Sequence, residues 1–225
     1  MFDALFTTTT EYKKLSHALS GKGACALFGL PASGRAQVYA ALCRQLDKPL
    51  CIVTPGEAEA TRFAADLNTL GIPAAVFPAR DYVLRPIEGT AREYEYRRLA
   101  VLGELVGGRL RAVAVPAEAL TQFTTPKEDF CANTRTLHTG DTLLRDDLLA
   151  ALFGAGYTRR AQVDGPGQFS VRGDIVDIFA PDQKMPVRME FWGDEIDTLH
   201  TFALTTQGRE DAIDKFYLSP AREVL

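Results

Sequence analysis

Long apolar runs are missing from this 225-residue sequence, and so are the features of exported proteins. No window approaches the roughly 20 apolar residues that a membrane-spanning helix needs. Residues Met1 to Thr10 lack the basic stretch and apolar core of a signal peptide. The four cysteines lie far apart without a Cys-x-x-Cys pair, and Cys25 and Cys51 sit in apolar runs that predict buried thiols. The sequence therefore predicts a cytoplasmic protein with reduced cysteines and no membrane segment.

An excess of positive charge is also missing, because the formal net charge is −4. Proteins that grip a phosphate backbone over a broad surface usually show a net basic balance or a basic stripe. The histidines His17, His138 and His200 have no metal-ligand spacing, and no Ser/His/Asp set is present. We therefore expect a poor stand-alone DNA binder with no metal site and no catalytic residues.

The first half of the sequence alternates short apolar runs with helical patterns. It predicts strands over 23–28, 50–53, 73–77 and 111–115, and helices over 35–46, 57–70 and 91–106. In the helix 57–70, i, i+3, i+4, i+7 spacing predicts a buried face of Ala60, Phe63, Ala64 and Leu67. Alternation of strands and helices is typical of a parallel sheet covered by helices. We assign residues 1–126 to such an α/β domain.

The pattern changes from about Pro126 onward. A short helix over 144–153 is followed by strands over 168–179, 187–192 and 195–202, with the two-residue loop Gly193-Asp194 between the last two. This order predicts a smaller, antiparallel α+β domain over 127–212. The strand 216–218 has no partner left in that domain. We therefore expect residues 213–225 to be the truncated start of a segment that returns to the first domain.

A glycine-containing loop joins the first predicted strand to the first predicted helix. Gly29 and Gly34 have the separation of the phosphate loop G-x-x-x-x-G-K-[ST]. Arg35 stands at the lysine position, and Ala36 stands where a hydroxyl would coordinate Mg²⁺. Three interpretations remain open: a coincidental strand–helix turn, an unusual active nucleotidase, or a phosphate-loop domain that has lost its ligand. The active enzyme is disfavoured because Val115 runs into Pro116 with no acidic Walker-B residue.

The second half resembles a known domain along its whole length. Ala155-Gly156-Tyr157 is followed by QFSVRGDIVDIF at 168–179, VRMEFWGDEID at 187–197 and LTTQG at 204–208. These segments are similar, in order, to the UvrA-binding domain that UvrB shares with the transcription-repair coupling factors (Mfd). UvrB carries an intact phosphate loop and the coupling factors a degenerate one, so the resemblance favours the coupling factors.

This resemblance implies an adaptor without catalysis, which recruits UvrA to stalled RNA polymerase. In that family ATP and Mg²⁺ belong to a translocase motor, and RNA polymerase and duplex DNA bind to regions that would lie beyond Leu225. We therefore expect no cofactor in this chain. One alternative is a nucleotide-binding fragment of a UvrB-like helicase subunit. Another is a direct nucleic-acid binder that uses Arg159, Arg160, Arg172 and Arg188.

Strand alternation predicts which side chains of the second domain point outward. In 187–192 the apolar residues alternate with Arg188, Glu190 and Trp192, which should face solvent. A two-residue loop pairs Trp192 with Glu195, Phe191 with Ile196, Glu190 with Asp197 and Arg188 with Leu199. Glu190 opposite Asp197 needs a nearby cation, for which Arg188 or Arg172 is the candidate.

The resemblance also assigns the UvrA contact to residues of this surface. The family's contact positions correspond to Arg172, Arg188 and Glu190, and a further arginine corresponds to Arg159, with Arg160 as the neighbouring register. UvrB has one more arginine where this chain has Ser170. The alternative interpretation is a solvated ion-pair face, in which each pair contributes only ~0–1 kcal/mol.

Overall fold

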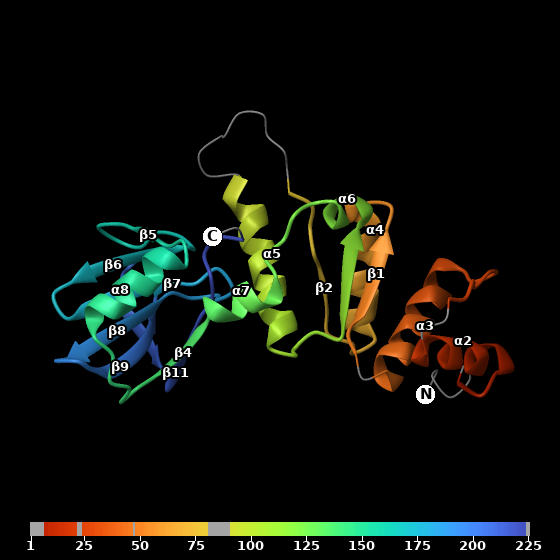
Figure 1. Ribbon diagram of the computed structural model, residues 1–225, viewed down its shortest axis with the longest axis horizontal. Helices are drawn as coiled ribbons and strands as arrows, with labels where there is room; N and C mark the ends of the chain where they lie inside the picture. The colour runs from red at the N-terminus through yellow and green to blue at the C-terminus, as the bar shows by residue number, and fades with distance from the viewer. Residues whose placement is uncertain (1–6, 22–23, 47, 81–90, 224–225) are drawn as a thin grey trace. The chain divides into compact units, whose positions relative to one another are not determined.

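The computed structural model describes residues 7–21, 24–46, 48–80 and 91–223 (Figure 1). The chain forms two compact units, each built from separate segments. The first unit contains 1–79 and 107–122, and the second contains 80–106 and 123–225. The unit boundary near 122 lies close to the predicted division at 126, but the helix over 91–106 belongs to the second unit.

The first unit contains a three-stranded parallel sheet. Its strands are β1 (Leu50–Thr54), β2 (Ala74–Val76) and β3 (Ala112–Pro116), in the order β1-β3-β2. The helices that the structure describes in this unit are α2 (Thr10–Ser20), α3 (Ala32–Gln45), α4 (Glu57–Thr69) and α6 (Ala117–Leu120). The predicted face of α4 is confirmed, because Ala60, Phe63, Ala64 and Leu67 are all buried in a core shared with β1 and β3.

The predicted strand 23–28 is wrong where the structure describes it. Residues 24–28 are irregular and exposed, and Gly23 lies outside the described residues. Apolar composition alone does not make a strand, because a strand also needs a hydrogen-bonded neighbour, and the described sheet contains only β1, β2 and β3. Cys25, in this irregular segment, is exposed rather than buried, and Cys51 is exposed as well. Cys51 alternates on β1 with Ile52 and Thr54, which are buried, so Cys51 and Val53 lie on the exposed side of the strand.

The second unit contains a six-stranded sheet, α5 (Ala91–Val106), α7 (Lys127–Ala132) and α8 (Arg145–Gly154). The strands are β5 (Thr158–Arg159), β6 (Gln168–Arg172), β7 (Ile175–Phe179), β8 (Val187–Trp192), β9 (Glu195–Phe202) and β10 (Arg209–Ala212). They follow the order β10-β9-β8-β7-β6-β5 and are antiparallel except for the pair β5–β6. The predicted antiparallel α+β architecture is therefore confirmed for this part of the chain.

Two tight hairpins shape this sheet. The loop Gly193-Asp194 joins β8 to β9 as predicted. The run 168–179, predicted as one strand, is instead a hairpin in which Arg172 pairs with Ile175. Gly173 makes this loop possible because its φ of 59° lies in the left-handed region, which a residue without Cβ adopts at little cost.

One face of the six-stranded sheet is covered by α8 (Figure 1). Leu148 and Leu152 of α8 are fully buried against sheet residues such as Phe169, Met189 and Ile196. Burying a large apolar side chain contributes about 1.5–3 kcal/mol. This packing fixes which side chains of each strand face α8. The opposite face carries charged side chains together with a smaller apolar cluster of Val163, Phe179 and Phe202.

The strand β11 (Lys215–Leu218) corrects a second prediction. It was expected to lack a partner, but it pairs antiparallel with β4 (Arg135–His138), a strand that the sequence did not reveal. Only Leu137 of β4 is buried, so the segment lacks the apolar alternation that identifies a strand. The segment 213–225 is thereby part of the second unit.

The chain after β11 packs against α5 of the same unit. Glu223 accepts hydrogen bonds from Arg98 Nε at 2.7 Å, Arg98 Nη2 at 2.8 Å and Thr124 Oγ1 at 2.6 Å. Arg80 Nε also donates to it, at 3.1 Å. The side chains of Arg98 and Glu223 are both fully buried, so each charge depends on the other. Among the described helices none is long and apolar enough to cross a membrane.

Candidate protein-interaction site

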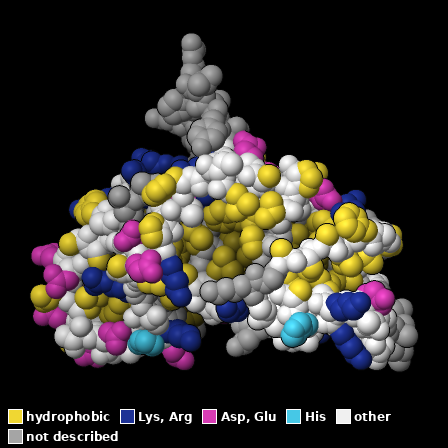
Figure 2. All heavy atoms as spheres, turned by 45° about the vertical axis from the view of Figure 1, so that its right-hand side comes forward, with side chains coloured by type: hydrophobic (Ala, Val, Ile, Leu, Met, Phe, Trp, Pro, Cys, Tyr) yellow, Lys and Arg dark blue, Asp and Glu magenta, His cyan; other side chains and the backbone are white. Residues whose placement is uncertain are grey.

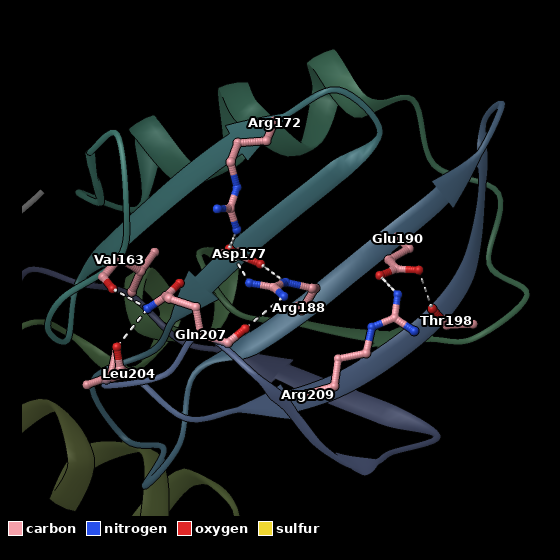
Figure 3. Close-up of polar contacts among 9 residues, drawn as sticks. All are labelled: Val163, Arg172, Asp177, Arg188, Glu190, Thr198, Leu204, Gln207 and Arg209. Atoms are coloured by element: carbon pink, nitrogen blue, oxygen red, sulfur yellow. Dashed lines mark hydrogen bonds and ion pairs between the residues drawn. The ribbon is translucent and has the colours of Figure 1, made fainter.

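The face of the six-stranded sheet opposite α8 carries a set of charged side chains. Along β8, residues 187, 189 and 191 are buried and the residues between them are not, as the alternation predicted. Arg172 comes from β6, Asp177 from β7, and Arg188 and Glu190 from β8 (Figure 3). The sheet thereby gathers three of the four predicted contact residues on one surface.

Asp177 lies at the centre of this surface and is almost completely buried. Its Oδ2 accepts hydrogen bonds from Arg172 Nη2 at 2.6 Å and from Arg188 Nη2 at 3.0 Å. Its Oδ1 accepts a third from Arg188 Nε at 2.7 Å. A buried carboxylate is tolerated when it is paired and hydrogen-bonded in this way. Two guanidinium groups around one carboxylate leave this cluster with a net positive charge.

Arg188 is held on several sides by its own domain. Besides Asp177 it contacts the Gln207 carbonyl oxygen, through Nη1 at 3.2 Å, and the Phe202 ring, whose centroid lies 4.7 Å from Cζ. Only 11% of its side chain is exposed. The hydrogen bonds to Asp177 raise the pKa of the Arg188 guanidinium, although partial burial acts in the opposite direction. Arg188 is therefore a fixed positive charge in the wall of the domain.

Arg172 is the more accessible of the two arginines. Its side chain is 46% exposed. Within the described part of the chain, its polar contact is the hydrogen bond to Asp177. A guanidinium carries five N–H donors in a fixed fork, so most of the donors of Arg172 remain for solvent or for another protein.

Glu190 has a different partner from the one predicted. It forms an ion pair with Arg209 and accepts a hydrogen bond from Thr198 Oγ1 at 3.4 Å (Figure 3). The predicted pairing with Asp197 is wrong, because the register shifts between Glu190 and Phe191 and sets Glu190 opposite Thr198. Such a bulge places an extra residue in one strand, here Asp197.

The same bulge changes the position opposite Arg188, which is His200 and not Leu199. Beyond the bulge, the pairs Phe191–Ile196 and Trp192–Glu195 are confirmed.

Trp192 lies at the end of β8 and is 83% exposed. It is the single tryptophan of the chain. Leaving so large an apolar side chain in water is unfavourable for an isolated domain, whereas tryptophan is enriched among the residues that dominate binding at protein interfaces. Trp192 therefore adds an apolar anchor point to a surface that is otherwise charged.

Arg159 is not brought together with the other predicted contact residues. It lies on the two-residue edge strand β5, is exposed, and pairs in parallel register with Phe169. Paired residues project to the same face of a sheet, so Arg159 belongs to the face that carries Phe169 rather than the face of Arg172. Ser170, where UvrB has an arginine, is 1% exposed and lies opposite Asp177. The substitution at this position therefore lies in the interior.

The predicted phosphate loop has its own internal contacts in the first unit. Gly29 has φ 81°, and Gly34 lies in the first turn of α3. Arg35 Nη1 lies 3.7 Å from Glu59 Oε1, and its Cζ lies 5.9 Å from the Phe63 ring centroid. Ala36 is buried. The comparison with a degenerate phosphate loop stays a prediction, and the cation of Arg35 is engaged by α4.

Two residues of the charged surface, Asp177 and Arg209, were not predicted from the sequence. Asp177 is the only polar residue in the apolar strand 175–179, a signal that marks a side chain needing a charged partner. Arg209 had no such signal, because β10 is exposed at every position and pairs irregularly with β9.

Comparison with known proteins matches this unit to a described family. The UvrB interaction domain matches residues 136–224, which include the whole charged surface. The chain is 38% identical, over 82% of its length, to the transcription-repair-coupling factor of Mycobacterium tuberculosis, and 28% identical, over 88%, to that of Bacillus subtilis. It is also 27% identical, over 88% of its length, to UvrABC system protein B of Chlorobium limicola.

These matches extend over most of this chain but only part of each relative. The chain covers 15% of the mycobacterial coupling factor, 17% of the Bacillus protein and 31% of the Chlorobium protein. The chain is therefore a homologue of the N-terminal region of transcription-repair coupling factors, and it carries a UvrB interaction domain in its second half.

Proposed function

We propose that this chain is a non-catalytic adaptor that recruits UvrA during transcription-coupled nucleotide excision repair. The observation that carries this proposal is that the UvrB interaction domain match coincides with the unit that presents Arg172, Trp192 and the Asp177 cluster. A UvrABC system protein B and a coupling factor are each related to the chain over 88% of its length. A partner common to both, UvrA, accounts for this shared domain.

The chemistry of the surface fits an acidic partner patch. Arg172 offers unused donors in a planar fork that matches a carboxylate, and Trp192, on β8 of the same sheet, offers exposed apolar area. Arg188 adds a positive charge at a fixed position, because its hydrogen bonds to Asp177 and Gln207 hold the guanidinium in place. Charge of this kind steers an acidic partner and fixes its register.

In the complete protein this adaptor would act beside other activities. The proposed setting is a cytoplasmic DNA translocase that uses ATP and Mg²⁺ and binds RNA polymerase and duplex DNA through regions outside this chain. The adaptor itself needs no cofactor. The proposed loss of nucleotide binding rests on Arg35, which pairs with Glu59, and on Ala36, which has no hydroxyl for a metal ion.

The alternatives draw less support from the charged surface. A nucleotide-binding fragment of a UvrB-like subunit would need the Gly29–Ala36 loop to hold phosphate. A direct nucleic-acid binder would need a continuous basic surface. On the face drawn in Figure 2, Asp and Glu side chains lie among the Lys and Arg side chains, and the net charge of the chain is −4.

Binding of purified UvrA to Arg172→Ala tests the proposal. Truncating one side of a desolvated charge pair costs ~2–5 kcal/mol of binding, a loss of about thirtyfold or more in affinity. Asp177 keeps its two hydrogen bonds from Arg188, so the melting temperature should change little. Arg172→Glu is less informative, because it would place a carboxylate against the buried Asp177.

Lys184→Glu is the matched control, because it changes the charge at an exposed position of the same unit. It should leave both UvrA affinity and stability close to those of the wild type. No detectable binding of UvrA by the wild-type chain, or equal binding by Arg172→Ala and the wild type, would refute the proposal.

A further inference from the structure

We infer that Asp177 is the positioning residue of the UvrA-binding surface. In this inference, which rests on the proposed function, Asp177 acts through Arg172 and does not itself contact the partner. Asp177 is 1% exposed, so it offers almost no area to another protein. Its carboxylate nevertheless holds both arginines of the surface, Arg172 and Arg188 (Figure 3).

The two arginines use this carboxylate in different ways. Arg188 takes one bond to each oxygen of Asp177, through Nε and Nη2, and its third nitrogen donates to the Gln207 carbonyl. Every nitrogen of Arg188 thus has a partner within the domain. Arg172 gives Asp177 a single bond through Nη2 and keeps the rest of its fork. Asp177, held in place by Arg188, therefore fixes the position of the Arg172 guanidinium.

The surroundings of Asp177 hold its carboxylate in one position, so that it does not move with the Arg172 side chain. It lies on the inner strand β7, in register with Ser170 on β6 and Arg188 on β8. Arg188 is in turn packed over the Phe202 ring and bonded to the segment that carries Gln207. Gln207 Nε2 donates to the carbonyls of Leu204 and Val163, which holds that segment down. The Asp177 carboxylate is therefore held in place, and its hydrogen bond to Arg172 orders the end of that long side chain.

A fixed guanidinium binds better than a free one, because less conformational freedom is lost on binding. Ordering one rotamer-rich side chain at an interface changes affinity by roughly two- to tenfold. The hydrogen bond to Asp177 orders the Arg172 side chain in the free protein, so this conformational freedom is not lost on binding. It also cancels part of the repulsion between Arg172 and Arg188, which would otherwise drive the two cations apart.

Asp177→Asn tests this role, because the amide keeps the shape of the side chain and removes its charge. UvrA affinity should fall about two- to tenfold, the size expected from losing the order of one side chain. In the Arg172→Ala background the same substitution should change affinity less than twofold. A purely structural role would give the same loss in both backgrounds, since additivity is the rule for independent effects.

Two further variants keep the test interpretable. Asp174→Asn removes one negative charge two residues from Arg172, but Asp174 pairs with Arg145, so its UvrA affinity should match the wild type. If Asp177→Asn fails to fold, Arg188→Met with Asp177→Asn removes the buried cation that lost its partner. That pair of changes should fold, since it leaves no uncompensated buried charge, and it should still show the loss relative to Arg188→Met.

A measurement without UvrA separates this inference from the proposed function. Nuclear magnetic relaxation of the Arg172 Nε–Hε group in the full chain should show an ordered side chain in the wild type and in Asp174→Asn. It should show a disordered one in Asp177→Asn. A mobile Arg172 in the wild type would overturn the inference whether or not UvrA binds, and equal losses of affinity with and without Arg172 would also overturn it. Absent UvrA binding with an ordered Arg172 would instead refute only the proposed function.

Discussion

Replacing Glu223 by glutamine tests the buried ion pair between α5 and the chain that follows β11. The substitution preserves shape but removes the charge, and it places an amide donor among the donors of Arg98 and Thr124. The guanidinium of Arg98, whose side chain is fully buried, then loses its carboxylate. Arg80 is 29% exposed and can turn toward water, so most of the penalty falls on Arg98.

The size of the effect follows from the burial of both groups. Removing one partner of a buried pair costs about 3–5 kcal/mol, because the remaining charge is left in a medium that solvates it poorly. A typical domain has a total stability of only about 5–15 kcal/mol. At roughly 2–4 °C per kcal/mol for a chain of this size, the melting temperature should fall by about 6–20 °C.

Thermal and urea unfolding followed by circular dichroism measures this loss. Glu210→Gln, on the exposed strand β10, is the control that should leave stability within about 0.5 kcal/mol of the wild type. Arg98→Met combined with Glu223→Leu should recover most of the stability, because it replaces the pair by apolar groups. A loss below about 1 kcal/mol in Glu223→Gln would refute the reasoning, since that is the range of an exposed pair.

Two further predictions concern pH and nucleotide. Burial raises the pKa of Glu223, but the hydrogen bonds from Arg98, Thr124 and Arg80 outweigh it and hold the pKa below its ordinary value of 4.5. The unfolded chain therefore takes up the proton first, so the stabilisation is complete above pH 4.5 and is lost as the pH falls through the folded-state pKa. Urea midpoints measured from pH 6 downward should fall more steeply in the wild type than in Glu223→Gln, and parallel curves would contradict this. For nucleotide, calorimetry should detect no binding of Mg-ATP, because Arg35 is engaged by Glu59 and Ala36 supplies no metal ligand; micromolar affinity would favour the UvrB-like alternative.

Periodicity predicted the elements whose burial is local and regular. Helix α4 and strands β8 and β9 were found from spacing alone, because their buried faces repeat at helical or strand period. The segment 24–28 misled for the opposite reason, since its composition suits a strand but pairing decides whether one forms. Strand β4 was missed because its pairing with β11 joins residues far apart in sequence, and only Leu137 is buried.

The charged surface was predicted as a set of positions but not as a network. Alternation placed Arg188 and Glu190 on the outer face, and the structure agrees. Their partners depended on one bulged residue, which moved Asp197 away from Glu190 and left room for Arg209. A hairpin loop does not reveal such a bulge in advance, because both registers use the same loop residues. The role of Asp177 required knowing that β7 lies between β6 and β8.

The separation of Arg98 from Glu223 has a consequence for the order in which the protein forms during translation. Their residue numbers differ by 125. At about 5–20 residues per second, roughly 6–25 s pass on the ribosome between the appearance of one partner and the other. The segments of the first unit are complete by residue 122, whereas the second unit waits for its last residues. The residues of α5 are thus synthesised several seconds before Glu223. During that interval Arg98 lacks the carboxylate that neutralises its charge in the folded unit.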